Sequence, residues 1–230
     1  MRRILWVILA LFTVGSAACR LLPGGESTAE SSTESSTGAA NPASEYCVEL
    51  GGSVEIRDES DGQVGYCMLP GGSECDEWEL FRGECTFDGD YRPLAADSCN
   101  SIASAMGDTL GLDITQQVAE FDDYVNQTSG MGCQAGAQGD GNDFESAPAA
   151  ADELGSMLAA QGWAVDAQYA ADSPTGTARA YSMDGGLCLL NVGWQPAAGA
   201  DCPDNQPIAA CELAPEQQLY TAVINCAQSN

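Results

Sequence analysis

The chain has 230 residues, of which 34 are acidic and seven are basic, and its formal net charge at pH 7 is −27. All seven basic residues are Arg, because the sequence contains neither Lys nor His. This composition excludes catalysis by a His-assisted nucleophile, imidazole metal ligands, Schiff-base chemistry and the phosphate-binding lysine of a Walker motif. The charge also argues against nucleic acid and anionic lipid surfaces as partners.

An acidic composition without Lys is also typical of salt-adapted proteins. Charged residues make up only 18% of this chain, however, whereas ordinary globular proteins contain about 25%. The imbalance results from missing bases more than from an excess of acids, so we do not favour salt adaptation.

The first 19 residues have the parts of a bacterial lipoprotein signal peptide. Arg2 and Arg3 form a basic start, and an apolar run of 11 residues follows at 4–14. A membrane-spanning helix needs about 20 residues, so the run fits a signal peptide better. The small residues before Cys19 resemble a lipobox, in which the cysteine thiol receives a diacylglyceryl group, although Ser16 stands where Leu is usual. We expect the signal peptide, residues 1–18, to be removed.

The cysteine count helps to choose between lipidation of Cys19 and ordinary cleavage after Ala18, which the small residues also permit. The chain contains 11 cysteines, and ordinary cleavage leaves this odd number in an oxidising compartment. Lipidation of Cys19 leaves ten, which can close five disulfides. We therefore expect a lipidated Cys19 and disulfides among Cys47, Cys67, Cys75, Cys85, Cys99, Cys133, Cys188, Cys202, Cys211 and Cys226.

Residues 19–44 are predicted to form the lipid anchor and a disordered tether. The tether is rich in Ser, Thr, Ala, Gly and Glu, and such a segment buries too little apolar surface to offset the entropy of ordering. A coil of about 25 residues reaches roughly 25–30 Å, which would hold a folded domain clear of the lipid headgroups. The protein is therefore expected in the cell envelope, facing outside the cytoplasm, either at the cell surface or in the periplasm.

Residues 45–90 are predicted to form a small domain that depends on disulfides, because so short a segment has little core of its own. Ser44 is expected to cap a short helix that ends at Gly51. Alternating apolar residues then predict two strands, and Asp61-Gly62 between them is a hairpin turn signal.

A second short helix is predicted after residue 73, with Ser73 as its cap and acidic residues in its first turn. The sequence Cys75-Asp76-Glu77-Trp78 in this helix places two carboxylates beside an aromatic ring. We favour helix capping and one core Trp over a catalytic role for these residues. Arg57 and Arg82 are expected to pair with nearby acids such as Asp76, Glu77 or Glu84.

This cysteine-rich segment resembles a small domain family known as domain of unknown function number 333, whose members carry a hemolysin label. The matching residues are Asn41-Pro42-Ala43-Ser44, Tyr46-Cys47-Val48, Gly51-Gly52, Glu55-Ile56-Arg57, Gly65, Cys67, Pro70, Gly72-Ser73, Cys75-Asp76-Glu77-Trp78 and Phe81-Arg82-Gly83-Glu84-Cys85. The resemblance implies an exported or lipid-anchored bacterial protein without an established activity. The segment has no amphipathic apolar stretch of the kind that pore formation needs.

Residues 93–230 are predicted to form a larger α+β domain, with two layers in which helices pack on a mostly antiparallel sheet. A helix is expected near 95–106, and a stronger one near 147–161 begins at the cap Ser146 and ends at Gly162. Apolar alternation predicts strands before and after the turn at Asp184-Gly185 and near the C-terminus. Six cysteines in this domain and four in the smaller one suggest bridges within each domain, whose connectivity stays open.

Metal and cofactor sites are not expected. There is no Cys-x-x-Cys spacing, which argues against zinc, iron–sulfur, haem and thioredoxin-like sites. The segment Gly139–Glu145 is the closest set of oxygen ligands for calcium, but Phe144 occupies the fifth position of the EF-hand pattern and Glu145 replaces its glycine. We therefore interpret this segment as a solvated loop.

Two pairs of neighbouring acids, Asp122-Asp123 and Asp152-Glu153, are the candidates for carboxylate catalysis of the kind that glycosidases use. Adjacent residues of a strand or helix point in different directions, so neither pair forms a ready-made catalytic dyad. We expect no catalytic residues. The glycosylation sequon Asn126-Gln127-Thr128 carries no functional prediction, because the lipobox implies a bacterial host.

The sequence therefore favours an exported, lipid-anchored bacterial surface lipoprotein that binds partners without catalysis. The alternatives are an extracytoplasmic, carboxylate-dependent hydrolase and an inhibitor or adhesion module. A pocket with two carboxyl groups of raised pKa would favour the hydrolase, and a surface with exposed aromatic residues would favour binding. Expected partners are the membrane, through the lipid on Cys19 only, and proteins, cationic peptides or divalent cations.

Overall fold

The computed structural model of the protein describes residues 41–69, 72–85, 87, 89–202 and 207–230. The predicted signal peptide, Cys19 and most of the predicted tether lie outside the described residues, as does part of the turn expected at 70–72. The described residues belong to a single unit of mutually contacting residues, 39–230. None of the described helices is long and apolar enough to cross a membrane.

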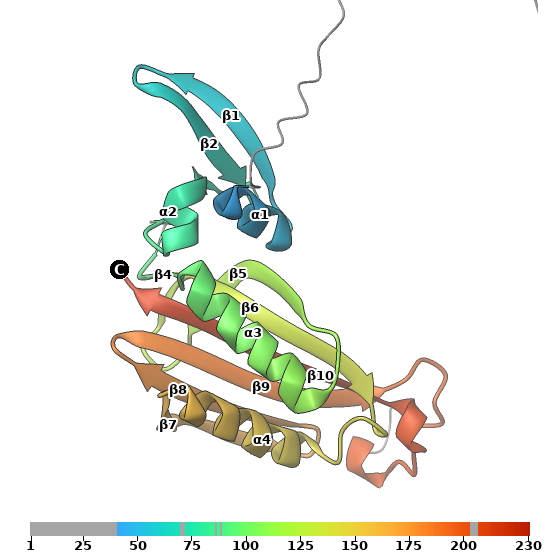
Figure 1. Cartoon of the computed structure of the whole chain (residues 1–230). Helices are drawn as coiled ribbons and strands as arrows, with labels where there is room; N and C mark the ends of the chain where they lie inside the picture. The colour runs from blue at the N-terminus through green and yellow to red at the C-terminus, as the bar shows by residue number, and fades with distance from the viewer. Residues whose placement is uncertain (1–40, 70–71, 86, 88, 203–206) are drawn as a thin grey trace, which may run out of the picture. The chain divides into compact units, whose positions relative to one another are not determined.

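The cysteine-rich segment folds into two short helices and a small antiparallel sheet (Figure 1). Strands β1 and β2 form the hairpin that Asp61-Gly62 predicted, with Ile56 opposite Gly65, and β3 adds to the free side of β2. The elements are α1 (Pro42–Glu49), β1 (Ser53–Glu59), β2 (Gly62–Met68), β3 (Glu74–Asp76) and α2 (Glu77–Arg82).

The caps of both helices differ from the prediction. Asn41 caps α1, since its side chain accepts a hydrogen bond from the backbone N–H of Ala43 and Pro42 fits the first turn. Ser44, the expected cap, lies inside the helix. Asp76, rather than Ser73, caps α2 and accepts hydrogen bonds from the N–H groups of Trp78 and Glu79. The predicted second helix was one turn too long, because its first residues pair with β2 as a strand.

The remaining elements form a seven-stranded sheet with two helices on one face, which confirms the predicted α+β class (Figure 1). The strand order is β5-β6-β4-β10-β9-β8-β7, and all pairs are antiparallel except β4 with β6. The elements are β4 (Tyr91–Pro93), α3 (Ala96–Leu110), β5 (Thr115–Asp123), β6 (Thr128–Asp140), α4 (Ala147–Ala160), β7 (Ala164–Ser173), β8 (Gly176–Met183), β9 (Gly186–Pro196), two 3₁₀ turns (Ile208–Ala210 and Pro215–Gln217) and β10 (Gln218–Ser229).

The main core lies between the two helices and the sheet. The predicted alternation is confirmed in β9 and β10, whose even-numbered residues from Cys188 to Val192 and from Tyr220 to Cys226 are buried in this core. Helix α4 contributes Leu154 and Leu158, and Ser146 caps it as predicted. The helix therefore packs through one apolar stripe while its charged residues stay exposed.

The opposite face of the sheet is covered at one end only. Phe121 of β5, Tyr169 of β7 and Leu187 and Leu189 of β9 form a second, smaller cluster there. Strands β5 and β7 are the two edges of the sheet, so the sheet curls until its edges meet at this end. No strands were predicted at β5, β6 and β7, so this cluster was not predicted either.

Ten cysteines form five disulfides in the described part of the chain. Each bridge joins two cysteines on the same side of the predicted domain boundary near residues 88–93. The pairs are Cys47–Cys67, Cys75–Cys85, Cys99–Cys133, Cys188–Cys226 and Cys202–Cys211. The first three bridges share one hydrophobic cluster, to which the small sheet, α2 and α3 all contribute.

Candidate functional site

The carboxylate of Glu77 is part of a buried polar cluster in the cysteine-rich segment. Glu77 is 4% exposed, and its two oxygens accept hydrogen bonds of 2.6 Å from the Asn41 amide and from the Ser44 hydroxyl. These bonds join the start of α1 to the start of α2. Glu77 lies in the first turn of α2, as predicted, and its carboxylate in addition ties the two helices together.

Glycines of the same segment are required by close packing. A Cβ atom on Gly65 would lie 2.5 Å from the Glu77 carboxyl carbon, and one on Gly52 would lie 2.9 Å from both sulfurs of the Cys47–Cys67 bridge. Gly83 ends α2 in the left-handed conformation with φ 67°. These three glycines of the family resemblance are thus explained by packing and backbone geometry.

Trp78 is one of the exposed apolar residues among those that carry the resemblance. The prediction of one core Trp was wrong, because 42% of the Trp78 side chain is exposed. Its ring makes an edge-to-face contact with Phe81 at 5.8 Å, while Leu80 occupies the core position of α2. Ile56 of β1 is also exposed. The segment therefore presents apolar side chains of the kind that protein-binding surfaces use.

The ion pairs of this segment agree only in part with the prediction. Arg82 pairs with Glu84 at 2.6 Å, as expected. Arg57 pairs instead with Glu74 at 2.7 Å and with Glu55 at 3.4 Å, and its guanidinium lies over the Tyr66 ring. These groups are exposed, so they contribute little to stability.

Asp123, a member of the first candidate acid pair, is buried within a network of hydrogen bonds. It is 1% exposed, and its Oδ1 accepts hydrogen bonds from the Tyr169 hydroxyl and from the backbone N–H groups of Val125 and Asn126. Its Oδ2 accepts from the Tyr91 hydroxyl and the Asn126 amide, each at 2.8 Å. Five donors therefore surround one carboxylate.

The pKa of Asp123 follows from this environment. Burial alone would raise it, but the hydrogen bonds from Asn126, Tyr169 and Tyr91 outweigh burial and hold the pKa of Asp123 below its ordinary value. The two tyrosines that donate to Asp123 shift in the opposite direction, because burial and the neighbouring carboxylate raise the pKa of Tyr169 and of Tyr91. Asp123 is thus ionised and fully bonded, whereas a general acid needs a raised pKa.

The two candidate acid pairs do not form dyads. Asp122 is exposed and Asp123 is buried, since consecutive residues of β5 face opposite sides of the sheet. Asp152 and Glu153 are both exposed on α4. The sequon residue Asn126 is engaged through its side-chain amide, which donates to Asp123 and to the Tyr169 hydroxyl.

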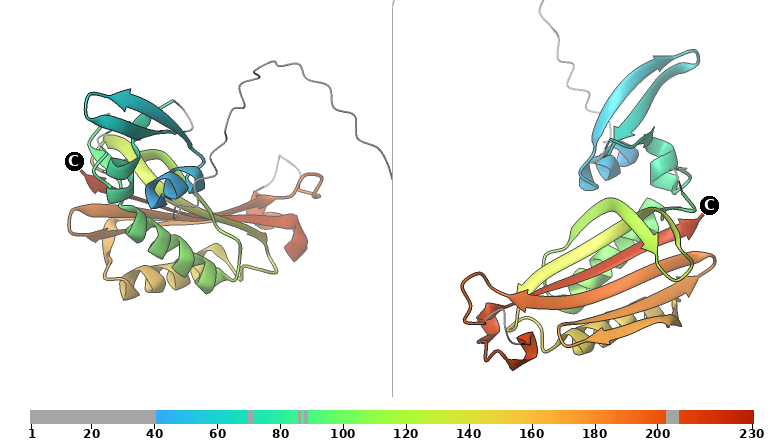
Figure 2. Two further views of the ribbon diagram at one scale, coloured as in Figure 1. Left: turned by 45° about the horizontal axis from the view of Figure 1, so that its top comes forward. Right: turned by 180° about the vertical axis from the view of Figure 1, so that it is seen from behind.

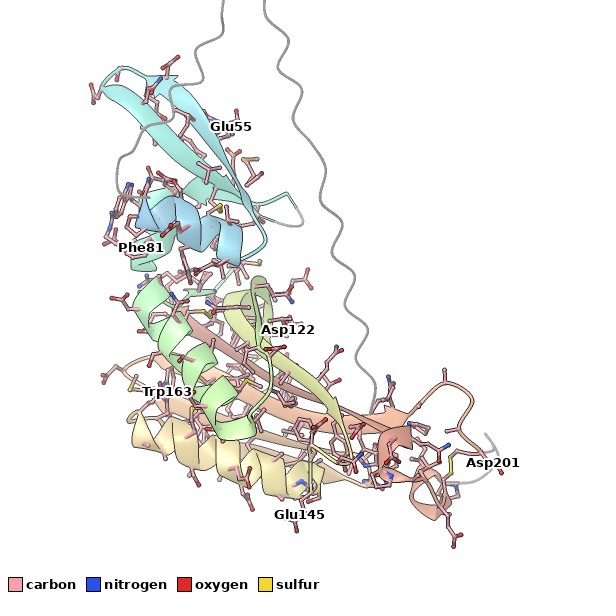
Figure 3. All side chains as sticks on the ribbon, turned by 45° about the vertical axis from the view of Figure 1, so that its right-hand side comes forward. Glu55, Phe81, Asp122, Glu145, Trp163 and Asp201 are labelled. Carbon is pink, nitrogen blue, oxygen red and sulfur yellow. A yellow bond between two sulfur atoms is a disulfide. The ribbon has the colours of Figure 1, made fainter. Side chains whose placement is uncertain are left out.

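The segment Gly139–Glu145 forms the end of β6 and the turn into α4 (Figure 3). Asp140 accepts a hydrogen bond from the Asn142 N–H at 2.7 Å, and Asp143 accepts one from the Asp140 N–H at 2.9 Å, so these acids shape the turn. Phe144 is buried and stacks on Tyr220 at 5.0 Å between ring centres. Phe144 thus anchors the turn to the core.

A hollow of about 380 Å³ lies beside this turn. It brings together acidic residues of the calcium candidate segment and one residue of the second candidate acid pair. Glu145 from the turn and Glu153 from α4 both line it, together with Asp143. Within the described residues, no group of three or more His, Cys, Asp or Glu side chains is arranged to hold a metal ion.

The partners of the two buried carboxylates in the described residues, Glu77 and Asp123, were not predicted. Tyr91 and Tyr169 lie 32 and 46 residues from Asp123, and Asn41 and Ser44 lie 36 and 33 residues from Glu77. No local spacing signals such contacts. The contacts of Asp123 with the backbone N–H groups of Val125 and Asn126 are local and could have been found, because an Asp side chain often accepts the N–H two residues on in an Asx turn.

Comparison with known proteins gives relatives for the cysteine-rich segment. Proteins called uncharacterized protein YoaF, from Escherichia coli strain K12, Escherichia coli O6:H1 and Shigella flexneri, are each 47% identical to this chain over 45 residues. The match covers 20% of this chain and 54% of each relative, so the chain spans about half the length of the curated relatives it matches. No solved structure matches the chain. Residues 38–84 match the family model described as Domain of unknown function (DUF333), and this part of the chain is a DUF333-like segment, as its motifs predicted.

Proposed function

We propose that the mature protein is a lipid-anchored protein of the bacterial cell envelope, which faces outside the cytoplasm and acts by binding rather than by catalysis. The use of the cysteines is the observation that carries this proposal. Ten of the 11 cysteines are paired with one another in five disulfides. Cys19 is the eleventh, and it follows a segment with the order of parts of a lipoprotein signal peptide.

The disulfides also support export. Disulfides form and persist in oxidising compartments, such as the periplasm and the cell surface, and are rare in the cytosol. A chain of this size with five bridges is therefore suited to a location outside the cytoplasm. After removal of residues 1–18, five Arg and 34 acidic residues remain, which gives a formal net charge of −29.

The electrostatics favour binding over the alternative of a carboxylate-dependent hydrolase. Such an enzyme needs one carboxyl group whose pKa is raised, so that it can serve as the acid. Among the described residues, the carboxyl groups with shifted pKa values are Glu74, Asp123 and Asp172. Hydrogen bonds lower the pKa of all three, and Glu74 and Asp172 also form ion pairs, with Arg57 and Arg179.

Exposed apolar side chains of the DUF333-like segment support a second binding role, that of an inhibitor or adhesion module. Trp78 and Ile56 protrude from a segment held by two disulfides, and rigid presentation of an aromatic residue lowers the entropic cost of binding. Proteins, cationic peptides and divalent cations are the ligands that the charge would attract. The membrane is a partner through the lipid only.

Mass spectrometry of the full-length gene product, expressed in a bacterial host and recovered from the membrane fraction, tests the anchor. We expect a mature N-terminus at Cys19 that carries a diacylglyceryl group, and no peptide from residues 1–18. A Cys19→Ser variant provides the control, because it removes the thiol without touching any disulfide and should lose both the lipid and the membrane association. An unmodified N-terminal Cys19 in the wild-type protein would refute the proposal.

A further inference from the structure

The face of the seven-stranded sheet opposite α3 and α4 is turned toward the viewer in Figure 2, right. A groove lies on this face, beyond the residues of the small hydrophobic cluster. Three adjoining hollows, of about 430, 350 and 390 Å³, make up this groove. The first and second share Asn191 and Gly193, and the first and third share Gln195, Leu219 and Thr221. We call these three hollows the sheet groove.

The sheet groove runs across the strands. Gly193 lies directly opposite Gly176 in β8 and opposite Thr221 in β10, and Thr221 lies opposite Gln138 in β6. These four residues therefore form one row across four neighbouring strands. Two of them, Gly176 and Gly193, are glycines, so no side chain stands in this row where β8 and β9 meet.

Neither backbone geometry nor crowding explains the glycine at position 193. Gly193 is absent from the residues with positive φ, and a Cβ atom there would meet only the Thr175 carbonyl oxygen, at the ordinary contact distance of 3.4 Å. A glycine inside a strand costs about 0.5–1 kcal/mol relative to Ala, and it often marks the close approach of a ligand. The small residue keeps the floor of the groove open.

The middle of the sheet groove is uncharged in a strongly acidic protein. The first hollow is lined by the amides Asn191 and Gln195, the hydroxyls of Thr175 and Thr221, and apolar groups that include Leu219 and Val223. Carboxylates line the two end hollows of the groove: Asp172, which pairs with Arg179 at 2.9 Å, at one end, and Asp140 and Asp143 at the other. An anionic polymer would meet these carboxylates, so the groove suits a neutral ligand.

The groove floor offers side chains but no free backbone groups. Strand β9 pairs with β8 and β10, and β10 pairs with β9 and β6, so their N–H and C=O groups are used within the sheet. An extended peptide gains its affinity from such backbone groups at a sheet edge. A ligand in this groove must instead bond to amides and hydroxyls while it packs apolar C–H groups against Leu219 and Val223.

We propose that the sheet groove binds a neutral oligosaccharide. Sugar rings combine hydroxyl groups with apolar C–H faces, which matches the lining of the groove in both respects, and a linear chain of rings fits a groove that crosses several strands. This inference deepens the proposed binding role and rests on it, since it names the ligand class, but it does not depend on the lipid at Cys19.

Titration calorimetry with the full-length protein tests the proposal, with maltohexaose, cellohexaose and chitohexaose as probes and a hexagalacturonate as the anionic comparison. We expect saturable binding of at least one neutral hexasaccharide below about 1 mM, unchanged when salt rises from about 50 to 500 mM. Asn191→Ala removes one amide and should weaken binding about five- to tenfold. Gly193→Val fills the floor and should weaken it at least about tenfold, since it also blocks close approach.

Gln168→Ala provides the matched control, because Gln168 is an exposed amide in β7 of the same sheet but does not line the groove. It should bind as the wild type does. Absence of binding to all three neutral probes would overturn the proposal, as would binding that survives both groove variants or that prefers hexagalacturonate. If Gly193→Val fails to fold, the binding affinity of Asn191→Ala alone tests the proposal. The lipid anchor is tested separately, by the mass of the N-terminal peptide that begins at Cys19. A negative result in the sugar titrations therefore does not bear on the anchor.

Discussion

The hydroxyl of Tyr169 donates a hydrogen bond of 2.8 Å to the carboxylate of Asp123, and this bond joins the two edge strands of the sheet. Tyr124 strengthens the junction, since its hydroxyl donates to the Tyr169 carbonyl oxygen and its ring packs edge-to-face on the Tyr169 ring. A sheet whose edges meet at one end is concave on the inner face. The sheet groove lies on this face, toward the end where the edges stay apart.

Replacement of Asp123 should destabilise the protein strongly. Asp123→Asn removes the charge from a buried site with five donors and points an amide donor at some of them, so we expect the free energy of unfolding to fall by about 3 kcal/mol. Chemical denaturation followed by tryptophan fluorescence measures this change. Asp122→Asn is the matched control, because Asp122 is the exposed neighbour, and its effect should stay within about 0.5 kcal/mol. Equal effects of the two substitutions would contradict the structural role of Asp123.

The same carboxylate should make stability depend on pH in the acid range. The pKa of Asp123 is lower in the folded protein than in the unfolded chain, where it is about 3.9. Its contribution is therefore fully present above about pH 4 and is lost as the pH falls through the lower folded value. The wild type and Asp123→Asn should differ most in Tm near neutral pH and converge toward about pH 2. A Tm difference that stays constant over this range would show that the charge is not responsible.

Some of this structure could be predicted from local sequence signals. Ser146, Pro148 and Gly162 mark the bounds of α4, and Asp61-Gly62 and Asp184-Gly185 mark two hairpins. These elements were predicted because capping and turn formation depend on residues within a few positions of one another.

Contacts over long sequence distances were not predictable in this way. Asn41 and Ser44 can both cap a helix, but the Ser44 hydroxyl instead donates a hydrogen bond to Glu77, 33 residues away. The hairpin of β5 and β6 is rich in Gly and Gln, so it has weak apolar alternation. Its position becomes clear only when Phe121 packs against Tyr169 and Leu189 from the other half of the sheet.

Gly65→Ala should destabilise the cysteine-rich segment. The added Cβ atom would lie 2.5 Å from both the carboxyl carbon and one oxygen of Glu77, and Glu77 cannot move without losing its bonds to Asn41 and Ser44. We expect a loss of about 1–3 kcal/mol in the free energy of unfolding. Gly193→Ala is the control: it adds the same methyl group to another strand, at ordinary contact distance, and should be neutral or slightly stabilising. If both substitutions have the same effect, the Glu77 contact does not explain Gly65.

The five disulfides should differ in their resistance to reduction, because a reducing thiolate must reach a sulfur atom. Eight of the bridged cysteines are buried, with at most 7% of their surface exposed, and they form the four bridges Cys47–Cys67, Cys75–Cys85, Cys99–Cys133 and Cys188–Cys226. Cys202 and Cys211, which form the fifth bridge, are only partly buried and lie in the segment between β9 and β10. Mild reduction should therefore open Cys202–Cys211 first.

Alkylation of the reduced protein with a mass-labelled reagent, followed by peptide mapping, measures the order of reduction. At low concentrations of reductant, the label should appear on Cys202 and Cys211 while the far-ultraviolet circular dichroism stays unchanged, because this bridge has a sequence separation of only 9 and neither cysteine lies in a strand. The paired variant Cys202→Ser with Cys211→Ser should accordingly retain its sheet signal. The variant Cys188→Ser with Cys226→Ser should lose more stability, since this bridge crosses two paired central strands inside the main core and closes a longer loop, of separation 38. Early labelling of Cys47 or Cys75 would show instead that the DUF333-like segment opens before the rest of the chain.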